Sequence, residues 1–276
     1  MKIHQTADAV RLPRMSTSEL RESFLVDGLF APDAVILAYT NVDRAVLGGA
    51  VPISRRLVLE PPDLLRAASF TERRELGVLN LGGTGTITVD GYPQAMAPRD
   101  ALYIGRGRHQ IEFASADGAA PARFYLVSYP AHEAHPMQHA GFASAEAEKL
   151  GSARDANRRT IYKYIHGNGI RSCQLVMGFT LLEEGSVWNT MPSHTHLRRS
   201  EVYLYFGINP DACVLHLFGP PDSTRAIFVH NEQAVLSPPW SIHSGVGTRA
   251  YGFVWAMGGE NQEFADMDAI AVSDLR

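Results

Sequence analysis

The sequence predicts an all-β fold built from two similar units, and three features support this prediction. Short segments rich in Val, Ile, Leu, Tyr and Phe alternate with Gly, Pro or Asp-Gly turns, the usual pattern of strands joined by hairpins. Long helical periodicity is scarce. Two segments of the first half resemble two segments of the second half in the same order, which indicates a duplication. A β-sandwich or β-barrel is therefore the expected architecture.

The elements follow from these patterns in chain order. Strands and hairpins are expected in residues 76–98, 101–115, 201–219 and 225–238, where apolar segments end at Gly, Pro or Asp-Gly. Glycines in "GGTGTITVDG" belong to a hairpin, because no helix pattern or lysine follows them as a phosphate-binding loop requires. A few short helices are predicted at residues 16–25, 63–68 and 144–151.

The duplication rests on two pairs of segments. "ERRELGVLNLGG" and "LRRSEVYLYFG" share a double arginine, a glutamate and an apolar strand, and "QAMAPRDALYIG" resembles "QAVLSPPWSIHSG". This alignment places Glu75 opposite Glu201 and Ile104 opposite His243. It predicts two domains, residues 1–147 and 148–276, separated in a polar stretch. The first lacks histidines before its glutamate, so we expect it to be without metal ligands.

Composition limits the partners. The formal charge is −4 and the pI about 6.3, so no global basic field attracts nucleic acid or anionic lipid. No apolar stretch reaches the roughly 18 residues of a membrane span, and no signal-peptide pattern opens the chain. The two cysteines, Cys173 and Cys213, are too few for a disulfide framework. These features predict a cytoplasmic protein with a small-molecule ligand, no nucleic acid and no membrane.

One short stretch carries the donors of a metal site. His194 and His196 are two residues apart, so on a strand they face the same side. Glu201 has the wrong parity for that strand, but a turn through residues 197–200 lets it start a returning strand and point back. His243 follows a Pro-Pro turn and is the natural fourth donor. Three imidazoles and a carboxylate suit Zn, Fe, Mn, Ni or Cu.

This donor set leaves several reactions open. A bound ion can polarise a carbonyl, support oxygen chemistry or hold a ligand. The H-x-H, the following Glu and the late His resemble the two metal-binding motifs of the cupin superfamily. Longer blocks look like the 5-keto-4-deoxyuronate isomerase family over nearly the whole chain, among them "ERRELGVLNLGGTGTITVDG", "NRRTIYKYI", "WNTMPSHTHLRRSEVYLYF" and "HNEQAVLSPPWSIHSGVGTRAYGFVWAMGGENQEFADMD".

The resemblance implies a fold and an activity. The fold is a two-domain bicupin, a pair of duplicated double-stranded β-helix (jelly-roll) barrels. The implied metal is Zn²⁺, one per subunit, held by His194, His196, Glu201 and His243. The implied reaction converts 5-dehydro-4-deoxy-D-glucuronate to 3-deoxy-D-glycero-2,5-hexodiulosonate in pectin degradation. Family members form homo-oligomers, often hexamers, so the same is expected of this chain.

A ketol shift also needs groups that move protons and hold the substrate. A base must remove the C2 proton and a proton must reach C1. The candidates are Glu232, Lys163, Tyr162 and Tyr203. A uronate carboxylate favours a bidentate arginine, for which Arg159 and Arg199 are the candidates.

Three other functions remain open. The first is isomerisation of another deoxy-uronate, such as 5-deoxyglucuronate in inositol catabolism. The second is a redox cupin dioxygenase, which would consume oxygen at Fe(II). The third is a non-catalytic sugar-binding bicupin, which would bind its ligand without forming a ketol product.

Overall fold

The computed structural model describes all residues, 1–276, and the chain forms two compact units. Unit 1 comprises residues 1–3, 28–145 and 164–176, and unit 2 comprises residues 4–27, 146–163 and 177–276. The division into domains at residues 147 and 148 stays a prediction. Each unit contains a large sheet and a four-stranded sheet. The predicted all-β class is confirmed.

The large sheet of unit 1 has seven strands. In spatial order they are β1 (Lys2–His4), β3 (Val35–Thr40), β4 (Val46–Ala50), β11 (Phe124–Pro130), β6 (Arg74–Asn80), β9 (Ala101–Ile104) and β12 (Gln138–Ala140). The four-stranded sheet consists of β5 (Leu57–Val58), β10 (Ile111–Ser115), β7 (Gly85–Val89) and β8 (Tyr92–Met96). The two sheets enclose a core, because Leu76 and Val78 of β6 pack with Ile87 and Phe113 of the smaller sheet.

The large sheet of unit 2 also has seven strands. They are β13 (Glu146–Leu150), β14 (Arg159–Ile165), β15 (Val176–Leu182), β23 (Gly252–Gly259), β18 (Arg199–Phe206), β21 (Ala234–Ser237) and β2 (Leu25–Val26). The four-stranded sheet consists of β16 (Trp188–Asn189), β22 (Ile242–Gly247), β19 (Val214–Gly219) and β20 (Arg225–Val229). A separate pair joins β17 (His194–Thr195) to β24 (Asp268–Ala269).

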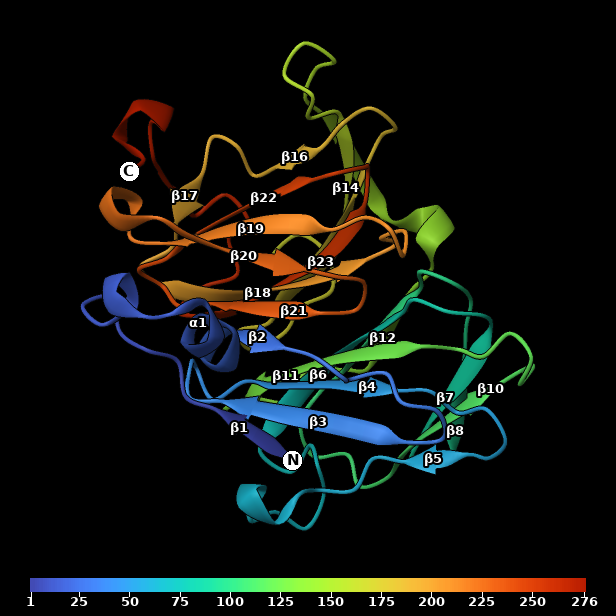
Figure 1. Ribbon diagram of the computed structural model, residues 1–276. Helices are drawn as coiled ribbons and strands as arrows, with labels where there is room; N and C mark the ends of the chain where they lie inside the picture. Colours follow the sequence, from blue (N-terminus) through green and yellow to red (C-terminus); the bar gives the residue numbers. More distant parts are fainter. The chain divides into compact units, whose positions relative to one another are not determined.

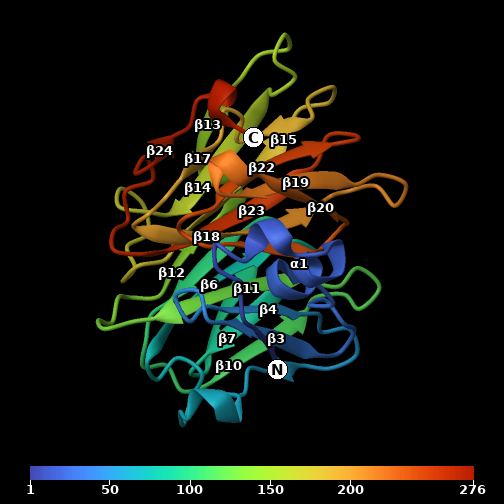
Figure 2. The ribbon, with the colours of Figure 1, turned by 60° about the vertical axis from the view of Figure 1, so that its left-hand side comes forward.

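Strand order is the same in the two units. The series β4-β11-β6-β9 of unit 1 matches β15-β23-β18-β21 of unit 2, and β5-β10-β7-β8 matches β16-β22-β19-β20. In both views of the ribbon, β19, β20 and β22 run together as one layer of unit 2 (Figures 1 and 2). A repeated order of this kind confirms the duplicated jelly-roll architecture.

The strand order also corrects part of the predicted alignment. Ile104 ends β9, whose counterpart is β21, whereas His243 lies in β22, whose counterpart is β10. Ile104 and His243 are therefore not equivalent. The predicted alignment was wrong here because apolar strand residues and turn glycines recur throughout β-rich sequences, so two unrelated segments can look similar.

The helices are few and short. Helix α1 (Thr17–Phe24) begins with a capping box between Ser16 and Glu19 and buries Leu20 and Phe24, as predicted for residues 16–25. Five single turns of 3-10 helix complete the set: Leu12–Arg14, Asp63–Leu65, Phe142–Ser144, Pro221–Ser223 and Val272–Asp274.

The helix predicted at residues 144–151 is wrong. That segment forms β13, which pairs with β14. Glu146 and Glu148 lie on one side of the strand and both form ion pairs with Lys163 of the neighbouring strand. Tertiary pairing therefore overrides the helical propensity of Ala, Glu, Lys and Leu. No helix in the structure is both long and apolar enough to cross a membrane.

Candidate metal centre

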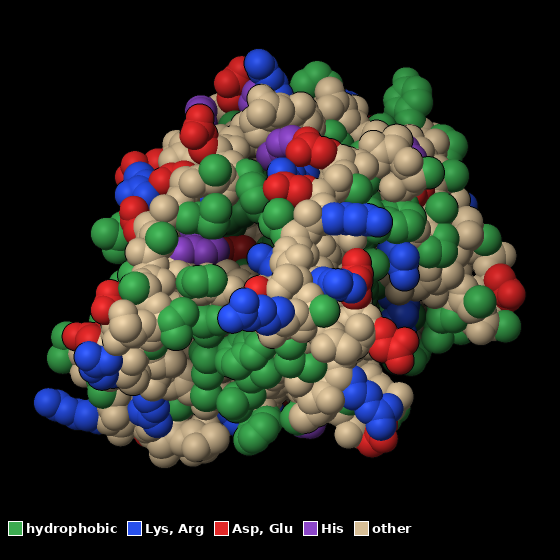
Figure 3. All heavy atoms as spheres, turned by 90° about the horizontal axis from the view of Figure 1, so that it is seen from above, with side chains coloured by type: hydrophobic (Ala, Val, Ile, Leu, Met, Phe, Trp, Pro, Cys, Tyr) green, Lys and Arg blue, Asp and Glu red, His purple; other side chains and the backbone are tan.

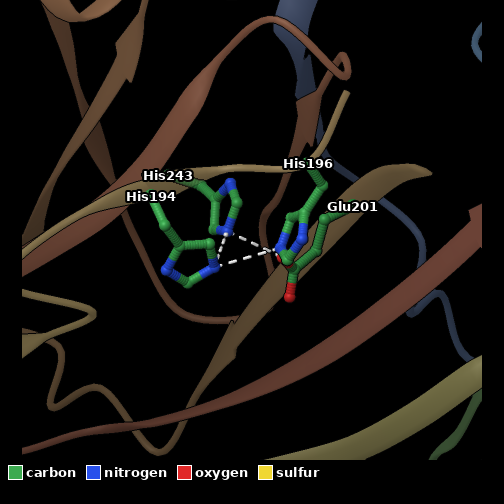
Figure 4. Close-up of side chains that lie close together, drawn as sticks. All are labelled: His194, His196, Glu201 and His243. Atoms are coloured by element: carbon green, nitrogen blue, oxygen red, sulfur yellow. Dashed lines mark hydrogen bonds and ion pairs between the residues drawn. The ribbon is translucent and has the colours of Figure 1, made fainter. Parts of the chain in front are cut away.

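The four predicted metal ligands lie together in unit 2. The candidate donor atoms of His194, His196, Glu201 and His243 are all within 4.8 Å of one another. The Nε2 atom of His194 is 3.0 Å from the Nε2 atoms of both His196 and His243. Glu201 Oε2 lies 3.1 Å from His196 Nε2 and 2.8 Å from His243 Nε2. Figure 4 shows the three imidazoles turned toward one another, with Glu201 beside His196.

Three different elements position these ligands. His194 belongs to β17, and His196 follows it at a tight turn closed by a hydrogen bond from Arg199 N to His196 O, 3.0 Å. Glu201 is the third residue of β18, and His243 is the second residue of β22. The turn was predicted, but the hairpin was not formed, because β17 pairs with β24 and not with β18.

The hydrogen bonding of His196 fits a cation at this point. Its Nδ1 is 2.7 Å from the carbonyl oxygen of Asp266, so a neutral ring donates there and leaves a lone pair on Nε2. That lone pair faces Glu201 Oε2, which is also an acceptor. Two acceptors at this separation repel each other unless a cation lies between them. The group could therefore hold a metal ion.

Electrostatics favour the same arrangement. Burial, with a smaller contribution from the nearby His243, lowers the pKa of His194 to about 2, so the imidazole is neutral at physiological pH. Burial raises the pKa of the Glu201 carboxyl, but His243 and His196 lower it by more, so the side chain is ionised. Neutral imidazoles and an ionised carboxylate are the forms that bind metal ions.

The segment of residues 261–268, called here the C-terminal strap, orients His196. Buried Arg199 donates to the carbonyl oxygens of Glu263 (2.6 Å) and Asp266 (2.8 Å). Arg198 donates to both carboxylate oxygens of Asp266 at 2.8 and 2.9 Å. Sequence reasoning missed Asp266, because its contact with His196 is made by the backbone carbonyl and no side-chain pattern encodes such a contact.

A pocket of about 250 Å³ opens beside the donors. Its lining residues come from unit 2 and are mostly apolar: Leu150, Arg159, Ile161, Thr180, Thr190, Pro192, His194, His196, Glu201, Tyr203, Phe253, Trp255, Met257, Phe264 and Met267. Pockets for drug-sized ligands measure about 300–1,000 Å³, so this one suits a small molecule. In Figure 3, histidine and acidic side chains lie in a hollow bordered by hydrophobic ones.

Two of the predicted catalytic and substrate-binding residues line this pocket. Tyr203 is buried, and its hydroxyl lies 2.9 Å from Thr190 Oγ1. Burial raises the pKa of Tyr203 well above its usual value, and the charge of Glu201 raises it further, so the phenol keeps its proton. Arg159 is half-buried, donates to the carbonyl oxygen of Asn157 and makes no ion pair.

The other four predicted residues lie outside the pocket lining. Lys163 pairs with Glu146 and Glu148 and covers the ring of Phe264. Tyr162 stacks on Phe179, on the opposite face of β14 from Arg159. Glu232 lies in the turn between β20 and β21. Arg199 contacts the strap, behind His196.

Fold and site together define a bicupin with one cluster of three histidines and a glutamate that could hold a metal ion. The chain belongs to the KduI/IolB family, whose model matches residues 35–273. It is similar to the 4-deoxy-L-threo-5-hexosulose-uronate ketol-isomerase of Shouchella clausii, 53% identical over 261 residues and 95% of each chain. The enzyme of the same name from Burkholderia cenocepacia is 51% identical over 280 residues and 100% of each chain.

Solved structures agree on the fold. An IolB-like protein from Salmonella typhimurium LT2 superposes with a TM-score of 0.67 at 13% identity, covering 82% of this chain and 87% of that one. An oxalate decarboxylase variant from B. subtilis superposes with a TM-score of 0.57 at 9% identity, covering 79% and 70%. At such low identity these likenesses concern the fold alone. They support the bicupin architecture.

Proposed function

We propose that this protein is a Zn²⁺-dependent ketol-isomerase that converts 5-dehydro-4-deoxy-D-glucuronate to 3-deoxy-D-glycero-2,5-hexodiulosonate in pectin degradation. The names of full-length relatives with about half of their residues identical support the reaction. One observation carries the proposal. The group of His194, His196, Glu201 and His243 lies at the same pocket as Arg159, an arginine that has no carboxylate partner.

Arg159 is the residue we assign to the substrate carboxylate. Its guanidinium is half-buried at the pocket, where burial lowers its pKa while Tyr203 and Glu148 raise it. A planar guanidinium binds a carboxylate through two parallel hydrogen bonds, which fixes the position of the substrate as well as its charge. The uronate would then extend from Arg159 toward the histidine cluster.

Two side chains are placed to handle protons. Tyr203 carries its proton at neutral pH; it can donate that proton to the C1 carbonyl oxygen and take up the proton of the C2 hydroxyl in return. Glu201 is the only carboxylate of the pocket lining, and its Oε1 makes no hydrogen bond within the protein. We propose that this Oε1 accepts the proton from C2 and returns it to C1. A bound divalent ion would supply a Lewis acid that polarises the carbonyl.

The apolar lining has a separate part in the proposal. Phe253, Trp255 and Phe264 limit the water that can enter the pocket. Exclusion of water strengthens the electrostatic interactions among the polar groups that remain. Trp255 is itself held in place by a hydrogen bond from Nε1 to Thr180 Oγ1, 3.2 Å.

We also propose that the protein forms a homo-oligomer, which light scattering would measure.

The test is a coupled assay of ketol isomerisation on purified protein. We expect turnover of 5-dehydro-4-deoxy-D-glucuronate, its loss after chelation, and its return when Zn²⁺ is restored. Turnover of 5-deoxyglucuronate in its place would assign the chain to the other deoxy-uronate. Oxygen consumption with Fe(II) would indicate a dioxygenase, and tight sugar binding without product would indicate a binding protein.

A further inference from the structure

Unit 1 contains a second pocket with a different chemistry. It measures about 290 Å³ and is lined by Arg44, Leu65, Ala67, Phe70, Arg73, Arg74 and Pro130. Three of these seven residues are arginines and none is acidic. We call this set the arginine pocket. The chain as a whole carries a net charge of −4, so the pocket is a local concentration of positive charge.

Arg74 is the central residue of the arginine pocket. Its side chain is only 7% exposed, yet it makes no ion pair. Nε donates to Ser128 Oγ at 3.1 Å, and Nη2 donates to the carbonyl oxygens of Arg44 (2.7 Å) and Ser128 (2.8 Å). The two N–H groups of Nη1 have no protein acceptor. Because a buried charge without a counter-charge is costly, this guanidinium is suited to bind an anion.

The other arginines enlarge the positive field. Burial is the main cause that lowers the pKa of Arg74 to about 10; Tyr39 and Tyr129 act against it, and the positive charge of the neighbouring Arg44 acts with it. Arg74 therefore remains protonated at neutral pH. Arg73 donates through Nη2 to the carbonyl oxygens of Leu65 and Arg66, which fixes it to the pocket wall. Its only ion pair, with Glu72 at 3.4 Å, is exposed and weak.

The equivalent arginine of unit 2 has different hydrogen-bond partners. Arg74 is the first residue of β6 and Arg199 is the first residue of β18, the equivalent strand. Arg199 donates to two carbonyl oxygens of the C-terminal strap. Arg74 also donates to two carbonyl oxygens, those of Arg44 and Ser128, but both bonds come from Nη2, so its Nη1 has no acceptor of the kind that Glu263 provides for Arg199. The equivalent arginine of unit 1 is therefore left open to a ligand.

We propose that the arginine pocket binds a small oxyanion, a carboxylate or a phosphate group, through Arg74, with Arg44 and Arg73 adding charge. The non-polar part of such a ligand would contact Phe70 and Pro130. Guanidinium groups match the planar carboxylate and the phosphate oxygens in geometry as well as charge. The proposal concerns unit 1 and does not depend on the proposed isomerase activity.

The test is isothermal titration calorimetry at low ionic strength with inorganic phosphate and, separately, with D-glucuronate. The protein carries the His196→Ala and Arg159→Gln substitutions, so that neither the metal centre nor the arginine proposed for the substrate carboxylate adds binding of its own. We expect saturable binding of at least one probe. The Arg44→Gln/Arg73→Gln double variant, which removes two positive charges at the pocket rim, should weaken it by about tenfold or more, because an anion bound to Arg74 loses the attraction of both charges. Arg74→Lys, which keeps the charge but not the fork, should weaken it as well.

Arg108→Gln is the matched control, because Arg108 is a partly exposed arginine of unit 1 outside the pocket. It should leave the affinity unchanged. Binding of phosphate alone would identify a phosphoryl ligand, and binding of glucuronate alone would identify a carboxylate ligand. The proposal is overturned if neither probe binds, or if the double variant and Arg108→Gln bind as tightly as each other.

Discussion

The strands β6 and β18 occupy the same place in their units, yet their glutamates have opposite roles. Each strand begins at the second arginine of a double arginine, Arg74 or Arg199. Glu75 is then the second residue of its strand, whereas Glu201 is the third. Side chains alternate between the faces of a sheet, so an offset of one residue places the two carboxylates on opposite faces. Leu76, not Glu75, is the structural counterpart of Glu201.

The consequence is visible in the contacts of Glu75. It is fully buried and accepts hydrogen bonds from the backbone N–H groups of Cys173 (2.7 Å), Gln174 (2.9 Å) and Leu175 (2.8 Å). Tyr103 also donates to it at 2.8 Å. In unit 1 the carboxylate binds the backbone of a chain segment, and in unit 2 it lies beside three histidines at the edge of a pocket. The position of a glutamate in the strand, more than its residue type, therefore decides whether it binds backbone groups or faces the pocket.

The largest effect is expected from His196→Ala. Removing one imidazole should abolish metal binding and reduce isomerase turnover to the assay background, because His196 touches Glu201 and His194 directly. The fold should persist, since His196 borders a pocket. Elemental analysis, turnover and circular dichroism measure these effects. His109→Ala, an exposed histidine of unit 1, is the control, and full turnover in metal-free His196→Ala would disprove the metal mechanism.

Substitutions of Arg199 and Arg159 should have smaller effects, and each should change a different kinetic parameter. Arg199→Lys removes the donors that hold the strap carbonyl against His196, so metal affinity or kcat should fall by about 10–100-fold, the usual cost of losing such support. Arg159→Gln should mainly raise KM for the uronate, because the arginine lines the pocket without touching the histidines. Steady-state kinetics with metal titration distinguish them, and the reverse pattern would exchange the two roles.

Substitution of Glu75 should change the stability of the protein, whereas substitution of Glu201 should change its metal binding. Glu75→Gln replaces an acceptor with a group that also donates, so it should lower the free energy of unfolding by roughly 3 kcal/mol and leave bound metal unchanged. Glu201→Gln should instead lower bound metal. Denaturant titration and elemental analysis measure both, with the partly exposed Glu72→Gln as the control. Loss of metal in Glu75→Gln at unchanged stability would contradict the assignment by parity.

A further effect, on the pH dependence of stability, concerns His216, buried in β19 beside Tyr205. Its counterpart region in unit 1, β7, contains no histidine. Burial, with a smaller contribution from the nearby His243, lowers the pKa of His216 to about 3. The unfolded chain takes up this proton below about pH 6.5, so stability should fall as the pH drops from about 6.5 to 3.

For this one residue the slope should be about 1 kcal/mol per pH unit. It should disappear in His216→Gln, while His109→Ala keeps it. The measurement is the free energy of unfolding by denaturant at a series of pH values. An identical slope in His216→Gln and in the parent protein would show that the imidazole is protonated in the folded state.

Much of the fold could be predicted because hydrophobic alternation and turn residues are local signals. The segments 76–98, 101–115, 201–219 and 225–238 all contain the expected strands, and α1 begins at its capping serine. One element was predicted wrongly. Residues 144–151 read as a helix but pair as β13, because the ion pairs of Lys163 come from a neighbouring strand that no local window includes.

The sequence by itself determined the donor set, because an H-x-H, a nearby glutamate and a late histidine name the ligand types. Only the tertiary structure decided which polar residues share their pocket. It brings Arg159 and Tyr203 to the histidines and places Tyr162 and Glu232 elsewhere. It also fixes the face of each glutamate and the strap carbonyl that orients His196. Strand parity and backbone contacts arise from pairing between distant segments, so residue identity alone does not contain them.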